Sequence, residues 1–404
     1  MTVLLALHIL ALFVIGGFLL HLFLLSLLAM IARVHPDIPS GRWRKIAVVI
    51  PAHNEEITIA GTIASVRAVH YPAAYFAIIV IADNCTDATA AIALREGAEV
   101  FERTSDEERS KGHALRWAFD RLRGREFEGV AIIDADSTVS RNFLSVLNGY
   151  FDAGAEVVQC NDQVRPEEGA WSPEAIRLGF ALNNYVRPLG RKVLGCSSGL
   201  RGNGMGFTMG VLREIPWEAY SQAEDLEHSL RLALRGIRVV YAPEATVLAT
   251  MTRDPRLAES QRARWEMGRF PLIRRYWRPL LLGAIRRRSL LIADTLLDLV
   301  TPALVNLVGI AILLGVVALV EYFVGDSSAL VVAELWALVV FLGLMHAVIG
   351  LVAAGSERSL LSMVWLVPRY AAWKFSLYFK IARKGAGKGW VRTAREPESA
   401  EDQP

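Results

Sequence analysis

The sequence predicts an α/β domain with a mostly parallel sheet and flanking helices, joined to transmembrane helices at both ends. Between residues 33 and 288, short β-rich runs alternate with amphipathic stretches, which is typical of strands that alternate with helices. On either side lie stretches without Asp, Glu, Lys or Arg: residues 1–32, 299–320 and 335–356. Each is long enough to cross a bilayer, which takes roughly 20 apolar residues.

Three pairs of strand and helix are expected in order along the soluble part. The strands are expected at residues 46–50, 77–82 and 129–133. The helices that follow them are expected at residues 56–69, 87–96 and 141–151. Ligands of such sheets bind beyond the carboxyl ends of the strands. All three loops that begin there carry acids, so we expect a metal-bound nucleotide at this edge.

Four apolar regions are expected to contact a bilayer: residues 3–31, 290–320, 329–354 and 360–379. The first is expected to be an uncleaved anchor, because it is too long for a signal peptide and its N-terminus lacks Lys and Arg. The last contains Pro368, Arg369 and Lys374 and is expected to be interfacial or re-entrant, which leaves three crossings. Asp294 and Asp298, in the second region, predict either a polar pathway or a position at the membrane interface.

Basic residues flank these regions and orient the chain. Arg33 follows the first region and Arg286, Arg287 and Arg288 precede the second, so the positive-inside rule places the soluble domain in the cytoplasm. We expect a multi-pass protein of the cell (inner) membrane. Its expected parts are an anchor (1–32), a cytoplasmic domain (33–270), a basic interfacial helix (271–288), a membrane region (289–380) and a tail (381–404).

Composition and spacing exclude several classes. A formal net charge of +3, without a continuous basic stripe, argues against nucleic-acid binding. The three cysteines have neither metal-knuckle nor disulfide spacing. The run Gly202-Asn203-Gly204-Met205-Gly206 does not follow a strand with dinucleotide-binding spacing, and it is expected to be a tight loop.

Two pairs of acids carry the expected chemistry. Asp134 and Asp136 follow the third strand, where two carboxylates can hold a divalent cation whose remaining positions bind pyrophosphate oxygens. Glu224 and Asp225 open an expected helix, where they either cap its N-terminus or supply the general base that deprotonates an acceptor hydroxyl. Asp83, at the end of the second strand, is expected near the nucleotide base or the metal.

A third motif lies in an expected helix before the second apolar region. Gln261, Arg264 and Trp265 share one helical face, because they stand at positions i, i+3 and i+4. Such a face offers a cation for pyrophosphate, an aromatic plane for a sugar ring and an amide that orients them.

In order, the motifs resemble those of the membrane-bound family 2 glycosyltransferases, the group of cellulose, chitooligosaccharide and hyaluronan synthases. The resemblance is carried by Pro51-Ala52-His53-Asn54-Glu55, Asp83, Asp134-Ala135-Asp136, Glu224-Asp225 and Gln261-Arg262-Ala263-Arg264-Trp265. It implies a GT-A-like (Rossmann-like) fold. It also implies inverting transfer of a hexose or N-acetylhexosamine from a UDP-sugar to a growing glycan.

The resemblance assigns roles by position. It implies that Asp136 and Asp134 bind Mg²⁺ or Mn²⁺ and that Asp225, beside Glu224, is the general base. The donor nucleotide is assigned to Pro51, Glu55, Asp83, Lys111, Asp134 and Arg264. The diphosphate and the acceptor end are assigned to Gln261, Arg264 and Trp265. Ala82 and Ala223 depart from the family pattern, because many members have Asp and Thr there.

Two alternatives stay open. The Gln-x-x-Arg-Trp motif favours a polymerising synthase, whereas few crossings favour a single transfer to a lipid-linked acceptor, unless subunits or an export partner complete a channel. A catalytically silent nucleotide-sugar-binding subunit is the alternative of another class. It predicts a missing base or metal acid, and neither is missing here.

Overall fold

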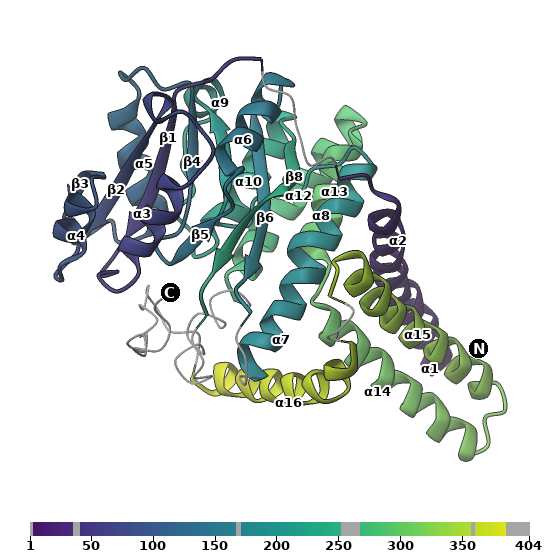
Figure 1. The fold of residues 1–404 in the computed structure, drawn as a ribbon. Helices are drawn as coiled ribbons and strands as arrows, with labels where there is room; N and C mark the ends of the chain where they lie inside the picture. The colour runs from purple at the N-terminus through teal and green to yellow at the C-terminus, as the bar shows by residue number, and fades with distance from the viewer. Residues whose placement is uncertain (1–2, 35–40, 167–170, 252–266, 357–359, 385–404) are drawn as a thin grey trace.

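The computed structural model describes residues 3–34, 41–166, 171–251, 267–356 and 360–384 (Figure 1). An eight-stranded sheet forms the centre of the soluble part, with the strand order β3-β2-β1-β4-β7-β6-β8-β5. Strands β1, β2, β3 and β4 pair in parallel, as do β6 and β8, whereas β7 runs antiparallel to both of its neighbours and β5 to β8. The sequence-based prediction of a mostly parallel sheet with flanking helices is confirmed.

The strands have the following bounds: β1 Ile46–Ala52, β2 Phe76–Asp83, β3 Glu99–Arg103, β4 Gly129–Ile132, β5 Ser137–Val139, β6 Val157–Val164, β7 Met205–Thr208 and β8 Val239–Ala249. The helices of the soluble part are α3 Ile59–Arg67, α4 Thr89–Arg95, α5 Lys111–Leu122, α6 Phe143–Asp152, α7 Trp171–Phe180, α8 Arg187–Val193, α9 Met209–Glu214, α10 Glu224–Arg235, α12 Arg269–Arg287 and α13 Leu290–Val300. Short η2 (Ala73–Tyr75) precedes β2, and the π-helix η3 (Ala181–Val186) joins α7 to α8.

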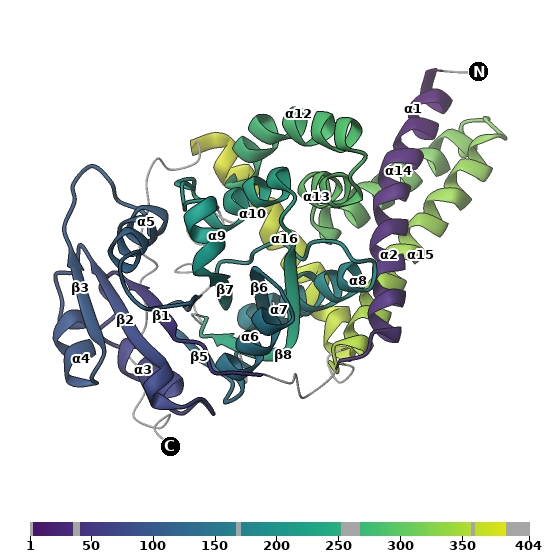
Figure 2. The ribbon, with the colours of Figure 1, turned by 90° about the horizontal axis from the view of Figure 1, so that it is seen from above.

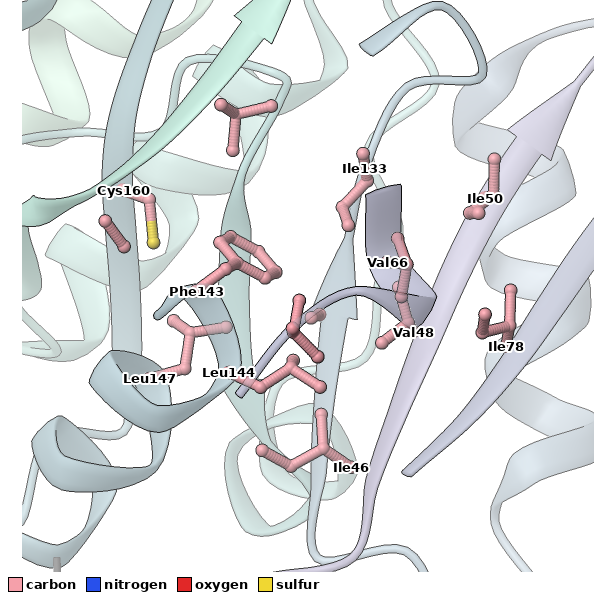
Figure 3. Packing of buried hydrophobic residues seen from close by; sticks show 14 of the residues in the cluster. Ile46, Val48, Ile50, Val66, Ile78, Ile133, Phe143, Leu144, Leu147 and Cys160 are labelled. Atoms are coloured by element: carbon pink, nitrogen blue, oxygen red, sulfur yellow. The ribbon is translucent and has the colours of Figure 1, made fainter. Parts of the chain in front are cut away.

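Successive residues of β1 explain why both faces of the sheet are covered. Ile46, Val48 and Ile50 are buried in one cluster with α3 and α6 (Figure 3), whereas Ala47 and Val49 are buried in another with α5, α9 and α10. Side chains of a strand alternate between faces, so a strand that is apolar at every position must be covered on both sides. Polar side chains are therefore confined to the ends of such strands, and the acids that follow them lie at the edge of the sheet.

Three helices are long and apolar enough to cross a membrane: Val3–Ile31, which comprises α1 (Val3–Ala11), η1 (Leu12–Gly16) and α2 (Gly17–Ile31), then α14 (Leu304–Phe323) and α15 (Ala329–Ala353). They indicate membrane association, and they agree in number with the three expected crossings. They project together from the side of the soluble part that lies opposite β3 and α4, and α16 (Leu360–Lys384) lies across the end of α7 (Figures 1 and 2).

One expected membrane region, residues 290–320, is not a single segment. The chain forms α13, then leaves helical conformation at residues 301–303, and α14 begins at Leu304. Pro302 accounts for the break, because proline lacks an amide donor and disfavours helical conformation in the residue before it. Only α14 belongs to the candidate span, and α13 packs through Ile292 and Leu299 against α10 and α12.

Helix α8 packs against α2, which belongs to the first candidate membrane span. A Cβ atom added to Gly190 would lie 2.4 Å from the carbonyl oxygen of Leu25 in α2, so the two helices meet backbone to backbone. On its other side, α8 directs the buried side chains of Arg187 and Arg191 towards α13. Arg187 Nη2 donates to Asp298 Oδ1 at 2.6 Å, and Arg191 Nε donates to Asp294 Oδ2 at 2.9 Å. The two acids of α13 are therefore paired with arginines.

Candidate active site

Two asparagines turn the chain sharply at the ends of β1 and β2. Asn54 and Asn84 adopt φ angles of 58° and 51°, a left-handed conformation that asparagine tolerates better than most residues. Asn54 Oδ1 accepts a hydrogen bond from the backbone N–H of Thr86 at 2.7 Å. This contact holds the two loops together, and the parallel pairing of β1 with β2 places Pro51, Glu55 and Asp83 at the same edge of the sheet.

Asp83, assigned to the nucleoside, ends strand β2 and is buried with an ion-pair partner. Arg103 Nη1, from the end of the adjacent strand β3, donates to Asp83 Oδ1 at 2.7 Å. Arg103 also pairs with Glu108 Oε2 at 3.0 Å. Glu55 is half-buried beyond β1, where its backbone N–H donates to Thr89 Oγ1 at 2.7 Å. Arg103 was not identified from the sequence, because its pairing depends on the register of β2 against β3.

The acids Asp134 and Asp136 directly follow β4, as predicted. The carbonyl between them, that of Ala135, accepts a hydrogen bond from Thr62 Oγ1 of α3 at 2.9 Å. Ser137 Oγ donates to Asp136 Oδ1 at 3.1 Å. Asp134 Oδ1 accepts from Lys111 Nζ, in the first turn of α5, at 2.5 Å. Lys111 is thus brought to the acid pair.

The second acid pair lies in the first turn of α10 and faces the first. Glu224 Oε1 is 3.9 Å from Lys111 Nζ. Glu227 Oε2, rather than the acid pair, accepts hydrogen bonds from the backbone N–H groups of Tyr220 and Ser221 just before the helix, at 3.2 and 3.1 Å. The structure therefore brings Lys111, Asp134, Glu224 and Asp225 together beyond the sheet edge. The position of Glu224 and Asp225 is also the one that favours carboxylates at a helix N-terminus, so a capping role is compatible with it.

Burial and mutual repulsion change the protonation of these acids. Burial raises the pKa of Glu224 to about 7, with a further increase from Asp225 that Lys111 opposes. Burial also raises the pKa of Asp225, against the hydrogen bond from the backbone of Leu226 and the charges of Lys111 and Arg201. For Lys111, burial lowers the pKa, but Asp134 and Glu224 outweigh it and raise the pKa overall.

A further acid, Asp162, belongs to the same electrostatic environment. It lies buried near the end of β6, and burial together with the charges of Asp134 and Asp136 raises its pKa well above the ordinary value. Its carboxylate accepts from Asn184 Nδ2 at 3.1 Å and from Asn203 Nδ2 at 3.4 Å. The sequence offered only one signal for Asp162, namely a polar residue within an otherwise buried strand.

The residues present fit a divalent cation that is shared with a phosphate ligand. Carboxylate oxygens suit hard cations such as Mg²⁺ and Mn²⁺. Within the part of the chain that the structure describes, no three His, Cys, Asp or Glu side chains are grouped to hold a metal by themselves. Negative charge is nevertheless concentrated here: besides burial, the charges of Asp136 and Asp225 raise the pKa of Asp134, and those of Asp134 and Asp136 raise the pKa of Asp162. An ion held by two protein carboxylates and completed by phosphate oxygens would neutralise this excess.

The expected tight loop at residues 202–206 is only partly a loop. Gly202 and Gly204 adopt φ angles of 83° and 68°, as a tight turn requires, but β7 begins at Met205. Lys111 Nζ donates to the carbonyl of Gly202 at 2.6 Å, so this turn borders the site. Gln261, Arg264 and Trp265 lie outside the described residues, and the roles assigned to them remain predictions.

The fold and the site define a GT-A-like glycosyltransferase domain. Residues 44–268 match the Glycosyltransferase like family 2, and because this match spans more than half of the chain, the protein belongs to that family. It is therefore a family 2 glycosyltransferase. The resemblance drawn from the motifs is confirmed at the level of this family.

Two named relatives differ in their products. The chain is 25% identical over 249 residues to the Beta-monoglucosyldiacylglycerol synthase of Synechocystis, covering 60% of this chain and 51% of that protein. It is 24% identical over 239 residues to the Poly-beta-1,6-N-acetyl-D-glucosamine synthase of Staphylococcus aureus, covering 58% of this chain and 56% of that protein. The chain thus spans about half the length of these relatives.

Among solved structures, the fold is similar to that of the mannosyltransferase PcManGT from Pyrobaculum calidifontis, in complex with GDP-Man and Mn²⁺. The sequences are 18% identical, the TM-score is 0.56, and the alignment covers 88% of this chain and 98% of that chain. At this identity, the likeness establishes the fold alone.

Proposed function

We propose that this protein is a metal-dependent, inverting glycosyltransferase that moves a hexose or N-acetylhexosamine from a UDP-sugar to a growing glycan at the cytoplasmic face of the membrane. One observation carries the proposal: the carboxylates of Asp134 and Glu224, from motifs 90 residues apart in the sequence, both contact Lys111 Nζ, at 2.5 and 3.9 Å. This brings the acid pair that follows β4 and the acid pair that opens α10 to the same lysine, beyond the sheet.

Each side chain has a distinct part in the proposed reaction. Asp136 and Asp134 would hold Mg²⁺ or Mn²⁺, which when bound supplies positive charge to the departing diphosphate. Lys111 adds a fixed positive charge at the same edge, where electrostatic stabilisation of a leaving group is worth most. Pro51, Glu55 and Asp83 border the position expected for the nucleoside.

The transfer itself is a single displacement. The oxygen of an acceptor hydroxyl forms a bond to the anomeric carbon while the bond from that carbon to the diphosphate oxygen breaks. The electron pair of the broken bond leaves with the nucleoside diphosphate. Asp225 takes the proton of the hydroxyl from the side opposite the leaving group, so an α-linked donor gives a β-linked product.

Two acceptor classes are distinguished by different observations. The Gln-x-x-Arg-Trp motif and the relative that is a poly-N-acetylglucosamine synthase favour a growing glycan. The three candidate spans and the relative that is a monoglucosyldiacylglycerol synthase favour a single transfer to a lipid. Mass spectrometry of the product would separate them, because a ladder of masses indicates a polymer and one added sugar a single transfer.

The experiment is release of nucleoside diphosphate by the protein in lipid nanodiscs, from a panel of UDP- and GDP-sugars with Mn²⁺ and native membrane lipids as acceptors. We expect turnover with one donor, and a loss of about 10²- to 10⁴-fold in Asp225→Asn with donor binding retained. Asp120→Asn, an exposed acid of α5 that pairs with Arg116, serves as the control. Donor binding without any turnover by the wild type would instead indicate a catalytically silent subunit.

A further inference from the structure

The turn at residues 202–204 lies between the two acid pairs, yet the proposed mechanism gives it no role. Lys111 bonds the carbonyl of Gly202, and a Cβ atom added to Gly202 would lie 3.3 Å from Asp225 Oδ2. The residue between the two glycines, Asn203, is 3% exposed. The side chain of Asn203 makes its hydrogen bonds to residues of the site.

The hydrogen bonds of Asn203 determine the orientation of its amide. Its Oδ1 accepts from the backbone N–H of Asp134 at 3.1 Å, and this N–H can only donate. Its Nδ2 therefore faces Ser137 Oγ at 2.9 Å and Asp162 Oδ1 at 3.4 Å. If the amide were flipped, its NH₂ group would face the backbone N–H of Asp134, and two donors would then meet in a buried place at a cost in energy.

Ser137 connects Asn203 to Asp136, the second of the two proposed metal ligands. Its hydroxyl accepts from Asn203 Nδ2, which leaves its own O–H free to donate, and Asp136 Oδ1 lies 3.1 Å away. A directed chain of hydrogen bonds thus runs from Asn203 through Ser137 to the carboxylate of Asp136. The same asparagine fixes the backbone of Asp134, so one residue supports both acids.

The backbone of the turn is itself fixed on both sides. Gln159 Nε2 donates to the carbonyl of Asn203 at 2.7 Å, and Gln159 Oε1 accepts from the backbone N–H of Arg201 at 2.8 Å. The N–H of Gly204 donates to the carbonyl of Ile132, at the end of β4, at 3.0 Å. Asn203 therefore has little freedom to move away from the acids.

We propose that Asn203 and Ser137 are positioning residues that hold Asp134 and Asp136 in the orientation needed to bind the divalent cation. The inference rests on the proposed metal-dependent transfer and deepens it. Partners of metal ligands typically change metal affinity by 10- to 100-fold when they are removed.

The test measures Mn²⁺ binding directly, by the loss of the free-ion electron paramagnetic resonance signal, in nanodiscs with and without UDP. In Asn203→Asp, an oxygen replaces the nitrogen that faces Ser137 and Asp162. Ser137→Ala removes the hydroxyl that links Asn203 to Asp136, and it keeps the hydrogen bond from the backbone N–H of Asp134 to Asn203. We expect the Kd for Mn²⁺ to rise by about 10- to 100-fold in the first and about 10-fold in the second. Saturating Mn²⁺ should restore much of the lost kcat in Ser137→Ala.

Asn148→Asp is the matched control. Asn148 of α6 is also buried, but its amide donates to the carbonyl of Arg42 and accepts from the backbone N–H of Arg44, away from the acids. It should keep the wild-type Kd even if its melting temperature falls. If Asn203→Asp does not fold, Ser137→Ala carries the test.

A Kd within twofold of wild type in the folded variants would overturn the inference alone. No Mn²⁺ binding by the wild type would overturn both the inference and the metal-dependent function on which it rests. Binding of Mn²⁺ and the donor by the wild type without release of nucleoside diphosphate would overturn the proposed function alone.

Discussion

Lys111 donates a hydrogen bond to the carbonyl oxygen of Gly202, at 2.6 Å, across 91 residues of sequence. The same nitrogen contacts Asp134 and Glu224, so one ammonium group links the start of α5, the end of β4, the turn before β7 and the start of α10. Lys111 therefore both supplies positive charge to the site and connects the segments that form it.

The first prediction follows from that position. Lys111→Met keeps most of the side-chain length but removes the charge, so kcat/KM for the donor should fall by about 100-fold, within the range seen when one electrostatic donor is lost. Steady-state release of nucleoside diphosphate measures it. Lys45→Met removes a lysine that pairs with the exposed Glu126, and should leave kcat/KM unchanged. Equal losses in both variants would contradict a specific role for Lys111.

The second prediction concerns Glu224, whose pKa is raised by burial to about 7. In the unfolded chain this carboxyl loses its proton near its ordinary pKa of about 4.3, whereas in the folded protein it keeps the proton until about pH 7. Raising the pH across this window therefore stabilises the unfolded state, and folding stability falls. In Glu224→Gln this contribution is absent.

We expect the metal-free wild type to lose up to about 3 kcal/mol of stability relative to Glu224→Gln between pH 5 and pH 8. Melting temperatures measured in detergent with EDTA at four pH values would show the two curves diverging as the pH rises. Parallel curves would mean that Glu224 titrates normally in the folded protein.

A third prediction concerns the buried pair of Arg103 and Asp83. The side chains are 4% and 12% exposed, so Arg103→Met leaves a buried carboxylate without its charged partner. Such changes cost about 3–5 kcal/mol, which lowers the melting temperature by roughly 6–20 °C. Glu108→Gln removes the other partner of Arg103, which is 61% exposed, and should have little effect. Similar decreases in melting temperature in both variants would contradict a specific stabilising role for the pair of Arg103 and Asp83.

The fourth prediction concerns the link between α8 and α13. Asp298 lies between Arg187 and Arg191, and although its burial raises its pKa, these arginines outweigh that effect and hold the pKa low. Asp298→Asn should therefore lower the melting temperature by several degrees, as breaking a buried pair does. Asp106→Asn, in an exposed pair with Arg109, is the control. An unchanged melting temperature in Asp298→Asn would show that the pair contributes nothing to stability.

The parts of the site that follow directly from a strand could be predicted from the sequence. Asp134 and Asp136 come after an apolar run with strand character, and the rule that ligands bind beyond strand ends places them correctly. The position of Glu224 and Asp225 at the start of a helix was predictable for the same local reason. That these two pairs face each other across Lys111 required the complete fold.

Contacts between distant segments were beyond sequence reasoning. Arg191 pairs with Asp294, 103 residues away, and nothing in either local pattern identifies the partner. Without those arginines, the acids of α13 predicted a polar pathway or an interfacial position. The break at Pro302 was visible in the sequence, but the apolar residues on both sides outweighed it in the prediction of one long segment.

The contact of Gly190 with Leu25 has a mechanical consequence. Membrane helices tilt to match the thickness of the hydrocarbon layer. Because α8 meets α2 without space between the backbones at Gly190, a change in the tilt of α2 would move α8, and residues 194–201 connect α8 to the turn that holds Asn203. We therefore expect hydrophobic mismatch to alter the geometry of the acids, so that the rate of the proposed reaction varies with the acyl-chain length of the bilayer.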